Sequence, residues 1–354
     1  MATGSVEPKL PEAPARRVEP ESPPLLSVVI PVLNEAGDIG RMLDELRQQA
    51  PPAGGFEVLV ADGGSTDATR AIVAERARAW PELRLLENPR RLSSAGRNVG
   101  VHAARGRYVL FLDGHCTLPR ADYLARTVEL FETTGAACLC RPQPLDRIAE
   151  SAWARAISAA RHSWLGHNPG SDIYGGAPGF TDPRSAGAAY QRACIDQLDS
   201  YDERFDACED VEFNHRVAAA RMTAYRHPDL SVPYRPRSSL RALWHQMVRY
   251  GRGRARLLAR HPDRVPWPLI LISALAVAIP VVLIAVGPRA ALALAAVSVG
   301  GWMLVVGVES LRVSGFTVAA TRTALAFAAI HAGLAVGFWR GLAEFPRYRS
   351  AARY

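Results

Sequence analysis

Residues 109–116 (VLFLDGHC) limit the possible folds of this chain more than any other stretch. An apolar run is followed at once by an acid, a glycine and a histidine. Such a run is typical of a strand buried on both faces of a parallel sheet. Asp113 and His115 then lie at the carboxyl end of that strand, where open α/β sheets bind ligands. A carboxylate and an imidazole two positions apart can bind one divalent cation, and Gly114 lets the backbone approach it. The alternative is a strand followed by a polar turn.

Earlier stretches repeat this pattern of an apolar run that ends in polar residues. The predicted strands cover residues 26–33, 56–61, 83–86 and 108–113, and the predicted helices cover residues 39–46, 94–104 and a stretch from residue 68, capped by Asp67. Strands that alternate with helices indicate right-handed βαβ units, and therefore an α/β fold with a mainly parallel sheet. Each polar cluster follows a strand, so the clusters are expected to gather along one edge of the sheet.

The charge and the cysteines narrow the class of protein. A formal charge of +8 suits nucleic acid, anionic lipid or a phosphorylated substrate. The chain has no zinc-finger spacing and no RNA-binding signature, which makes nucleic acid the weakest of the three. Five cysteines without a CxxC pair indicate reduced thiols on the cytosolic side of a membrane, and not a disulfide framework.

The two ends of the chain differ sharply in composition. Residues 1–24 are rich in Pro, Glu and Ala and are predicted to be a disordered tail, not a signal peptide. Residues 25–238 are predicted to form the α/β domain. Residues 239–264 combine an apolar helical face with many arginines, which is typical of a basic amphipathic helix in a membrane interface.

Residues 265–342 are predicted to hold two or three membrane helices. Residues 269–286 and 290–308 are uncharged and nearly long enough to span a bilayer, which takes roughly 20 residues. Residues 325–339 are shorter, and they either extend back past Arg322 to form a third span or lie in the interface. His331 within them is expected to form a hydrogen bond between helices. The basic tail, residues 343–354, favours a C-terminus inside the cell, whereas three spans would place it outside.

Three motifs carry a family resemblance. The segments PVLNE (residues 31–35), VADGGSTD (60–67) and LDGH (112–115) resemble, in their order and spacing, the nucleotide-sugar half of family 2 glycosyltransferases, which have the GT-A fold. The resemblance runs from about residue 27 to the C-terminus. Within the family the chain is most similar to the membrane-attached type of succinoglycan biosynthesis.

The resemblance implies roles for the residues of these motifs. The donor-binding set consists of Pro31, Asn34, Glu35, Asp62, Gly63, Arg97, Asp113, Gln246, Arg249 and Tyr250. Within it, Asp62 is expected to contact the base, taken as uracil, and Arg97 to approach the diphosphate. Asp113 and His115 occupy the metal-binding DxD positions. Histidine replaces the usual last aspartate, and imidazole suits Mn²⁺ better than Mg²⁺, so the choice between these metals stays open.

Glu209 and Asp210 are the candidate catalytic residues. Glycosyl transfer with inversion needs a base that takes the proton of the acceptor hydroxyl. The pair matches the family's ED motif, which implies that Asp210 is the base and that Glu209 orients the acceptor. The alternative is that both acids only stabilise the start of a helix.

Gln246, Arg249 and Tyr250 resemble the family's QxxRW motif, with tyrosine in place of tryptophan. Arg249 is expected to hold the diphosphate of the donor. The alternative is a purely basic stripe beside the membrane.

The resemblance and the apolar tail together predict an inverting, metal-dependent hexosyltransferase in the cytoplasmic membrane of a bacterium, with its catalytic domain in the cytosol. It would move a sugar from UDP-glucose or a similar donor to a lipid-linked glycan, in exopolysaccharide or other cell-surface glycan synthesis, with anionic lipids as further partners. One alternative is a polyisoprenyl-phosphate glycosyltransferase. Another is a non-catalytic membrane scaffold that keeps the fold.

Overall fold

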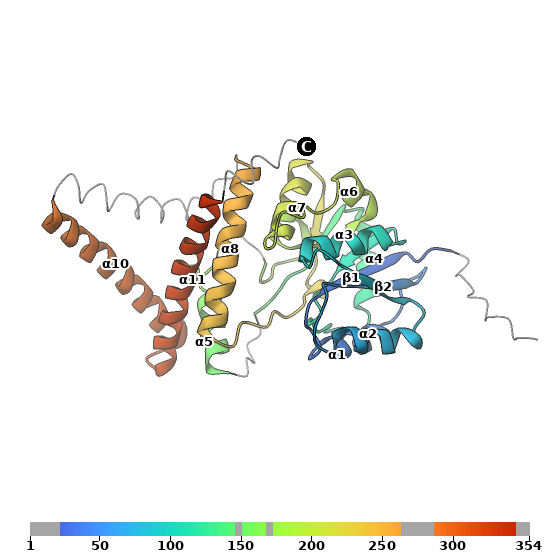
Figure 1. Ribbon diagram of the computed structural model, residues 1–354, viewed down its shortest axis with the longest axis horizontal. Coiled ribbons are helices and arrows are strands. Elements are labelled where there is room, and N and C mark those ends of the chain that lie inside the picture. Colours follow the sequence, from blue (N-terminus) through green and yellow to red (C-terminus); the bar gives the residue numbers. More distant parts are fainter. Residues whose placement is uncertain (1–21, 146–150, 168–172, 263–286, 345–354) are drawn as a thin grey trace, which may run out of the picture.

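The computed structural model describes residues 22–145, 151–167, 173–262 and 287–344. The described residues form one sheet and a group of long helices beside it (Figure 1). The strands are β1 (Leu26–Val32), β2 (Phe56–Asp62), β3 (Leu83–Glu87), β4 (Tyr108–Phe111), β5 (Cys138–Cys140), β6 (Gly179–Thr181), β7 (Gly187–Gln191) and β8 (Ala224–Arg226). The helices are α1 (Ile39–Arg47), α2 (Thr69–Arg78), α3 (Ser93–Ala103), α4 (Tyr123–Thr134), α5 (Ala152–His162), α6 (Arg192–Gln197), α7 (Glu209–Ala219), α8 (Leu240–Arg260), α10 (Pro288–Ser314) and α11 (Val318–Ala343), with two short 3₁₀ turns, Pro183–Ser185 and Pro228–Leu230.

The central strands are buried on both faces, as their unbroken apolar sequences predict. Successive side chains of a strand point to opposite faces. In β1, Val28 and Ile30 therefore join the core cluster that contains α1 and α4, whereas Val29 joins the cluster that contains Phe213 of α7. Burial of both faces explains why β1, β2 and β4 carry apolar runs without polar alternation.

The strand order is β3-β2-β1-β4-β7-β5-β8-β6. The first four strands are parallel, which confirms the predicted α/β fold with a mainly parallel sheet. After β1 the chain adds β2 and β3 on one side and then returns to place β4 on the other side. This reversal lies between β1 and β4, and such a switch point opens a crevice at the carboxyl ends of the two strands. The strands beyond β4 include antiparallel pairs, which the sequence pattern did not predict.

Helix α8 connects the sheet domain to the C-terminal helices (Figure 1). It packs closely along α11, and glycines make this approach possible. A β-carbon on Gly251 would lie 2.2 Å from the carbonyl oxygen of Leu334, and one on Gly337 would lie 2.1 Å from that of Val248. On its other side, a β-carbon on Gly253 would lie 2.8 Å from the carbonyl oxygen of Ala207. Helix α8 is thus packed between α11 and the loop before α7 of the sheet domain. Its position in a membrane interface stays a prediction.

Two described helices are long and apolar enough to cross a membrane, over Leu292–Ser314 and Val318–Ala343. The second begins before Arg322, which agrees with the alternative that the final apolar segment extends back past this residue. His331 bonds to Trp302 of α10 at 3.1 Å, which confirms its role between helices. The span predicted at residues 269–286, and the predicted tails apart from residues 22–24 and 343–344, lie outside the described residues.

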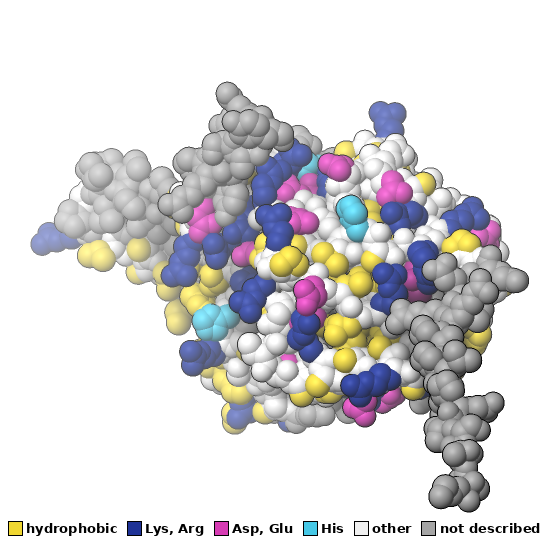
Figure 2. All heavy atoms as spheres, turned by 45° about the vertical axis from the view of Figure 1, so that its right-hand side comes forward, with side chains coloured by type: hydrophobic (Ala, Val, Ile, Leu, Met, Phe, Trp, Pro, Cys, Tyr) yellow, Lys and Arg dark blue, Asp and Glu magenta, His cyan; other side chains and the backbone are white. Residues whose placement is uncertain are grey.

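The surface of the sheet domain and the surface of helix α10 differ in polarity. Acidic and basic side chains are interspersed over the face of the sheet domain in Figure 2, with hydrophobic side chains between them. Helix α10, in contrast, exposes large apolar side chains along its length: Leu292, Leu294, Val297, Val299, Met303, Leu304 and Val308. An exposed apolar surface of this kind suits lipid or another apolar partner.

Candidate active site

The crevice at the switch point is flanked by the segments that follow β1 and β4. Glu35 comes from the first and His115 from the second, and Nδ1 of His115 lies 3.2 Å from Oε1 of Glu35. The contact with the Glu35 carboxylate raises the pKa of His115, and burial opposes this. The two predicted strand ends are therefore brought together, as their positions in the sequence indicated.

The loop after β1 is bound to the loop after β2 by hydrogen bonds. The backbone N–H of Asn34 donates to Oγ of Ser65 at 2.9 Å, and Oδ1 of Asn34 accepts from the N–H of Thr66 at 2.8 Å. The N–H of Glu35 donates to Oγ1 of Thr69 at 2.8 Å. Asn34 has a φ of 57°, a left-handed conformation that asparagine tolerates better than most residues. These contacts fix the direction of Glu35 towards His115.

Asp62 is fully buried beneath this pair of loops. Its carboxylate accepts from the N–H groups of Gly64 and Ser65 at 3.0 and 3.1 Å and from Arg70 at 3.0 Å. Although burial opposes it, these bonds lower the pKa of Asp62. Gly63 donates to the carbonyl of Val32 at 2.8 Å. Asp62 thus organises the loop from within, and its contact with a base stays a prediction.

Pro31 lies in β1 opposite Ala61 of β2. On the other side of β1 the pairing with β4 ends at Val29, so the missing N–H of Pro31 breaks no ladder bond there. Helix α3 packs against Pro31, because a β-carbon on Gly96 would lie 3.0 Å from its Cβ. Pro31 therefore lies in the sheet, between β2 and the start of α3.

Two arginines surround the carboxylate of Asp113. Nη2 of Arg97 lies 3.8 Å from Oδ1, and Nη2 of Arg141 lies 3.9 Å from Oδ2. Arg141 and then Arg97 lower the pKa of Asp113 against the effect of burial. The guanidinium of Arg97 also packs over the ring of Phe111, 5.2 Å from its centroid. The crevice thus carries two buried cations, which suit a diphosphate.

Arg141 was missed by the sequence analysis. It is only 7% exposed, and its Nε has no hydrogen-bond partner within the described residues. Its position could have revealed it, because Arg141 directly follows the short buried strand β5, and Asp113 comes two residues after β4. A polar residue at a strand end was the signal in both cases.

Glu209 and Asp210 begin helix α7, after Cys208 with a φ of 63°. Glu209 is buried, and Nε of Arg97 lies 3.5 Å from its Oε1. Burial raises the pKa of Glu209, and so does the charge of Asp210, while Arg97 opposes both. Asp210 is exposed, and its electrostatic influence reaches Arg97 and Tyr250. The predicted pair thus has one buried carboxylate and one that faces solvent beside the crevice.

The three predicted site residues of α8 differ in their contacts. Nε2 of Gln246 donates to the hydroxyls of Tyr234 and Tyr250 at 2.8 and 3.2 Å. Arg249 is exposed and donates to the carbonyl of Asp206 at 2.7 Å, on the loop before α7. Tyr250 is therefore close to Asp210, whereas Arg249 binds the protein's own backbone.

The side chains of Asp113 and His115 suit a divalent metal whose remaining ligands would be oxygens of the substrate. Among the described residues, no three His, Cys, Asp or Glu side chains are grouped to hold a metal on their own. Asp113 and His115 are 42% and 44% exposed, and Glu35 contacts Nδ1 of His115, so Nε2 stays available. A carboxylate on the second nitrogen is the usual partner of a metal-bound histidine. Asp113 and His115 would thus supply two ligands to such a metal, and oxygens of a bound substrate would complete its coordination.

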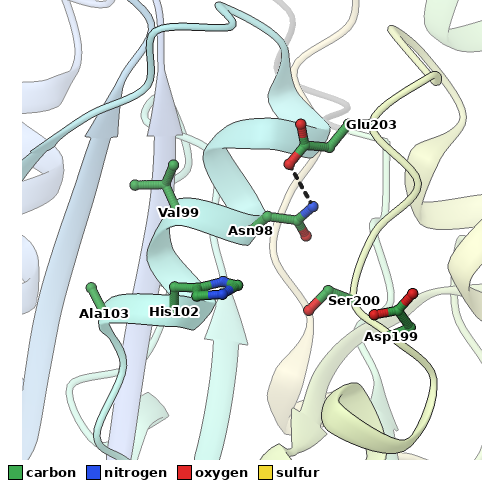
Figure 3. Close-up of a pocket in the computed structure, with 7 residues that line it drawn as sticks. All are labelled: Asn98, Val99, His102, Ala103, Asp199, Ser200 and Glu203. Carbon is green, nitrogen blue, oxygen red and sulfur yellow. Dashed lines mark hydrogen bonds between the residues drawn. The ribbon is translucent and has the colours of Figure 1, made fainter.

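A hollow of about 560 Å³ lies elsewhere, between α3 and the loop that follows α6 (Figure 3). Asn98 and Glu203, joined by a hydrogen bond of 2.9 Å, stand at its edge. No predicted site residue lines it, so it is separate from the crevice between β1 and β4.

The chain is similar to several known proteins. The model of the family described as "Glycosyl transferase family 2" matches residues 27–192. Over 337 residues the chain is 33% identical to the succinoglycan biosynthesis protein ExoA of Rhizobium meliloti, which covers 90% of this chain and 96% of that protein. Over 113 residues it is 39% identical to the glycosyltransferase AglE of Haloferax volcanii, which covers 32% of this chain and 37% of that protein.

A solved structure shares the fold. The mannosyltransferase PcManGT from Pyrobaculum calidifontis, in complex with GDP-Man and Mn²⁺, matches with a TM-score of 0.60 and 19% identity over 91% of this chain and 88% of that one. At this identity the likeness concerns the fold alone.

Proposed function

This chain belongs to glycosyl transferase family 2, and on that premise we propose that it is an inverting transferase that moves a sugar from a UDP-sugar, such as UDP-glucose, to a lipid-linked glycan. Family 2 glycosyltransferase activity in glycan synthesis is the established part. The observation that carries the proposal is the position of Arg97, which contacts Asp113 on the donor side and Glu209 on the acceptor side.

We assign the donor to the crevice between β1 and β4. Arg97 and Arg141 would bind the oxygens of the diphosphate, because both guanidinium groups lie beside Asp113 and are 13% or less exposed. Asp113 and His115 would hold Mn²⁺ or Mg²⁺, which neutralises the charge that develops on the leaving diphosphate. The relative bound to Mn²⁺ and a nucleotide sugar supports this assignment only through its fold.

We assign the acceptor to the side of Asp210. An acceptor hydroxyl that bonds to Asp210 loses its proton to this carboxylate as its oxygen attacks the anomeric carbon, and the bond from that carbon to the diphosphate breaks. The carboxylate of Asp210 faces solvent beside the crevice, where it can act as this base. Buried Glu209, held by Arg97, would orient the hydroxyl of the acceptor.

We also propose the division of the chain and its place in the cell. Residues 25–238 would form the catalytic domain, and α8, α10 and α11 would hold it at the cytoplasmic face of a bacterial inner membrane. The two long apolar helices support a membrane location by length and composition.

The test is release of nucleoside diphosphate by the detergent-solubilised protein, with a panel of UDP- and GDP-sugars, bacterial lipid extract, and Mn²⁺ or EDTA. Metal-dependent release that requires lipid, with a product of inverted anomeric configuration, supports the proposal. Release of GDP alone would refute the UDP assignment, and a retained configuration would remove Asp210 as base.

A further inference from the structure

Arg161 on α5 is a cation that the proposed mechanism does not use. Its Nη1 is buried and has no hydrogen-bond partner, and within the described residues no carboxylate lies at ion-pair distance from it. The guanidinium packs over the ring of Tyr234, 4.8 Å from its centroid, and it also forms hydrogen bonds with the side chains of Tyr234 and Tyr174. A buried charge that has no counter-charge among the described residues is costly, which points to an anion that binds here.

In the part of the chain that the structure describes, the groups that act on this cation are three tyrosines and no acid. Burial opposes ionisation of Arg161, but the neighbouring Tyr234, Tyr174 and Tyr250 raise its pKa, so the group stays charged. Burial likewise raises the pKa of Tyr174, which keeps its hydroxyl neutral. Neutral hydroxyls can donate to an anion without repelling it. The group formed by Arg161, Tyr174, Tyr234 and Tyr250 thus offers one positive charge and several donors.

A second unpartnered atom belongs to the same group. Nε2 of Gln246 binds Tyr234 and Tyr250, but Oε1 is buried and has no partner among the described residues. An amide oxygen accepts a hydrogen bond, which a phosphate without protons cannot donate. Oε1 of Gln246 can therefore accept a hydrogen bond from a hydroxyl beside the anion. A sugar attached to a phosphate would provide such a hydroxyl.

The group around Arg161 lies near the candidate catalytic residues on one side and near the apolar helix α11 on the other. Sγ of Cys208, just before Glu209, lies 3.8 Å from the carbonyl oxygen of Tyr250. In the other direction, Ile157 of α5 joins the apolar cluster of Phe327 and Ile330 on α11. Figure 1 shows α5 against α11, on the side of α8 away from the sheet. An anion at Arg161 would thus lie between the catalytic carboxylates and the apolar helices.

We propose that Arg161, with Tyr234 and Gln246, forms the subsite for the phosphate of a lipid-linked acceptor. Arg161 binds the phosphate, the oxygen of Gln246 accepts from a hydroxyl of the attached sugar, and the lipid chain runs towards α11. The inference rests on the proposed function and identifies where its acceptor binds. The subsite selects acceptors that carry a phosphate on an apolar chain.

The test measures binding of farnesyl diphosphate to the full-length protein in uncharged detergent, with UDP and Mn²⁺ present at saturation to fill the donor crevice. Farnesol and inorganic pyrophosphate are the comparison ligands. The Arg161→Gln variant should bind farnesyl diphosphate at least about tenfold more weakly, and Arg161→Lys should recover part of the loss. Arg155→Gln, an exposed position on the same helix, is the matched control and should leave binding unchanged.

Equal affinity of wild type and Arg161→Gln for farnesyl diphosphate would overturn the inference. Equal affinity of the wild type for farnesol would also overturn it, because the phosphate would then not be recognised. Pyrophosphate binding as tight as that of farnesyl diphosphate would overturn it as well, because the lipid chain would then not be recognised. Thermal unfolding of each variant checks that it is folded. Arg161-dependent binding without turnover of any nucleotide sugar would refute the proposed function but leave the lipid-phosphate site standing.

Discussion

Nε of Arg97 lies 3.5 Å from Oε1 of Glu209, and these residues come from helices far apart in the sequence. The same guanidinium reaches Asp113 at 3.8 Å, after β4. One side chain therefore sets the relative position of the crevice for the donor and the carboxylates for the acceptor. Its packing over Phe111 keeps it in this place.

Arg97→Gln should weaken donor binding and also destabilise the fold. The diphosphate loses a cation, so the KM for the nucleotide sugar should rise at least about tenfold. Buried Glu209 loses its partner, which should cost about 2 kcal/mol in the free energy of unfolding. Adding Glu209→Gln should recover stability but not activity. A double variant that loses the sum of the two single losses would show that the two residues are not coupled.

Asp210→Asn should leave the protein folded and able to bind UDP, but should lower kcat by about 10²–10⁴, the usual contribution of a general base. Asp210 is exposed, so its loss leaves no buried group unpaired. Asp196→Asn, an exposed acid on α6, is the control and should keep full activity. Unchanged kcat in Asp210→Asn would assign the proton to another group.

Glu35→Gln should weaken Mn²⁺ activation. The Glu35 carboxylate contacts Nδ1 of His115 at 3.2 Å and so orients the imidazole. Loss of such a carboxylate typically costs 10–100-fold in metal affinity. The measurement is the concentration of Mn²⁺ that gives half-maximal activity, after removal of metal with EDTA. Equal values for the variant and the wild type would place the metal elsewhere.

The strand-end site is predictable from the sequence because its signals are local. An apolar run followed by polar residues indicates a buried strand and its carboxyl end, and this pattern alone puts Asn34, Asp62 and Asp113 along one edge of the sheet. Arg161 and Tyr234 could not be found in this way. They lie far apart in the sequence and come together where Tyr234, before α8, pairs with Leu145, shortly before α5. Strands β5 to β8 include antiparallel and parallel pairs, and the three-residue strands β5, β6 and β8 give no clear period.

Glu212 should make stability depend on pH in the acid range. It is buried in α7, and although burial opposes it, hydrogen bonds from His261 and Arg216 lower the pKa of Glu212. Because the pKa of Glu212 is lower in the folded state, the ionised side chain stabilises the fold at pH values above the ordinary glutamate pKa of about 4.3. This stabilisation is lost as the pH falls through the pKa of the folded state. Glu212→Gln should therefore be less stable than wild type at pH 6, with a difference that shrinks below about pH 4. Exposed Glu75→Gln should show no such difference.

Gly337→Ala should separate α8 from α11. The added β-carbon would lie 2.1 Å from the carbonyl oxygen of Val248, which is backbone and cannot rotate away, so the helices must move apart. We expect a loss of roughly 1–3 kcal/mol in stability and a lower kcat, because α8 also carries Tyr250 and Gln246. Gly300→Ala in α10, where a β-carbon meets no atom within 4 Å, is the matched control and should be neutral or slightly stabilising. The measurement is thermal unfolding in detergent together with turnover of the nucleotide sugar. Equal unfolding temperatures for the two variants would show that close packing of α8 on α11 does not hold the catalytic domain in place.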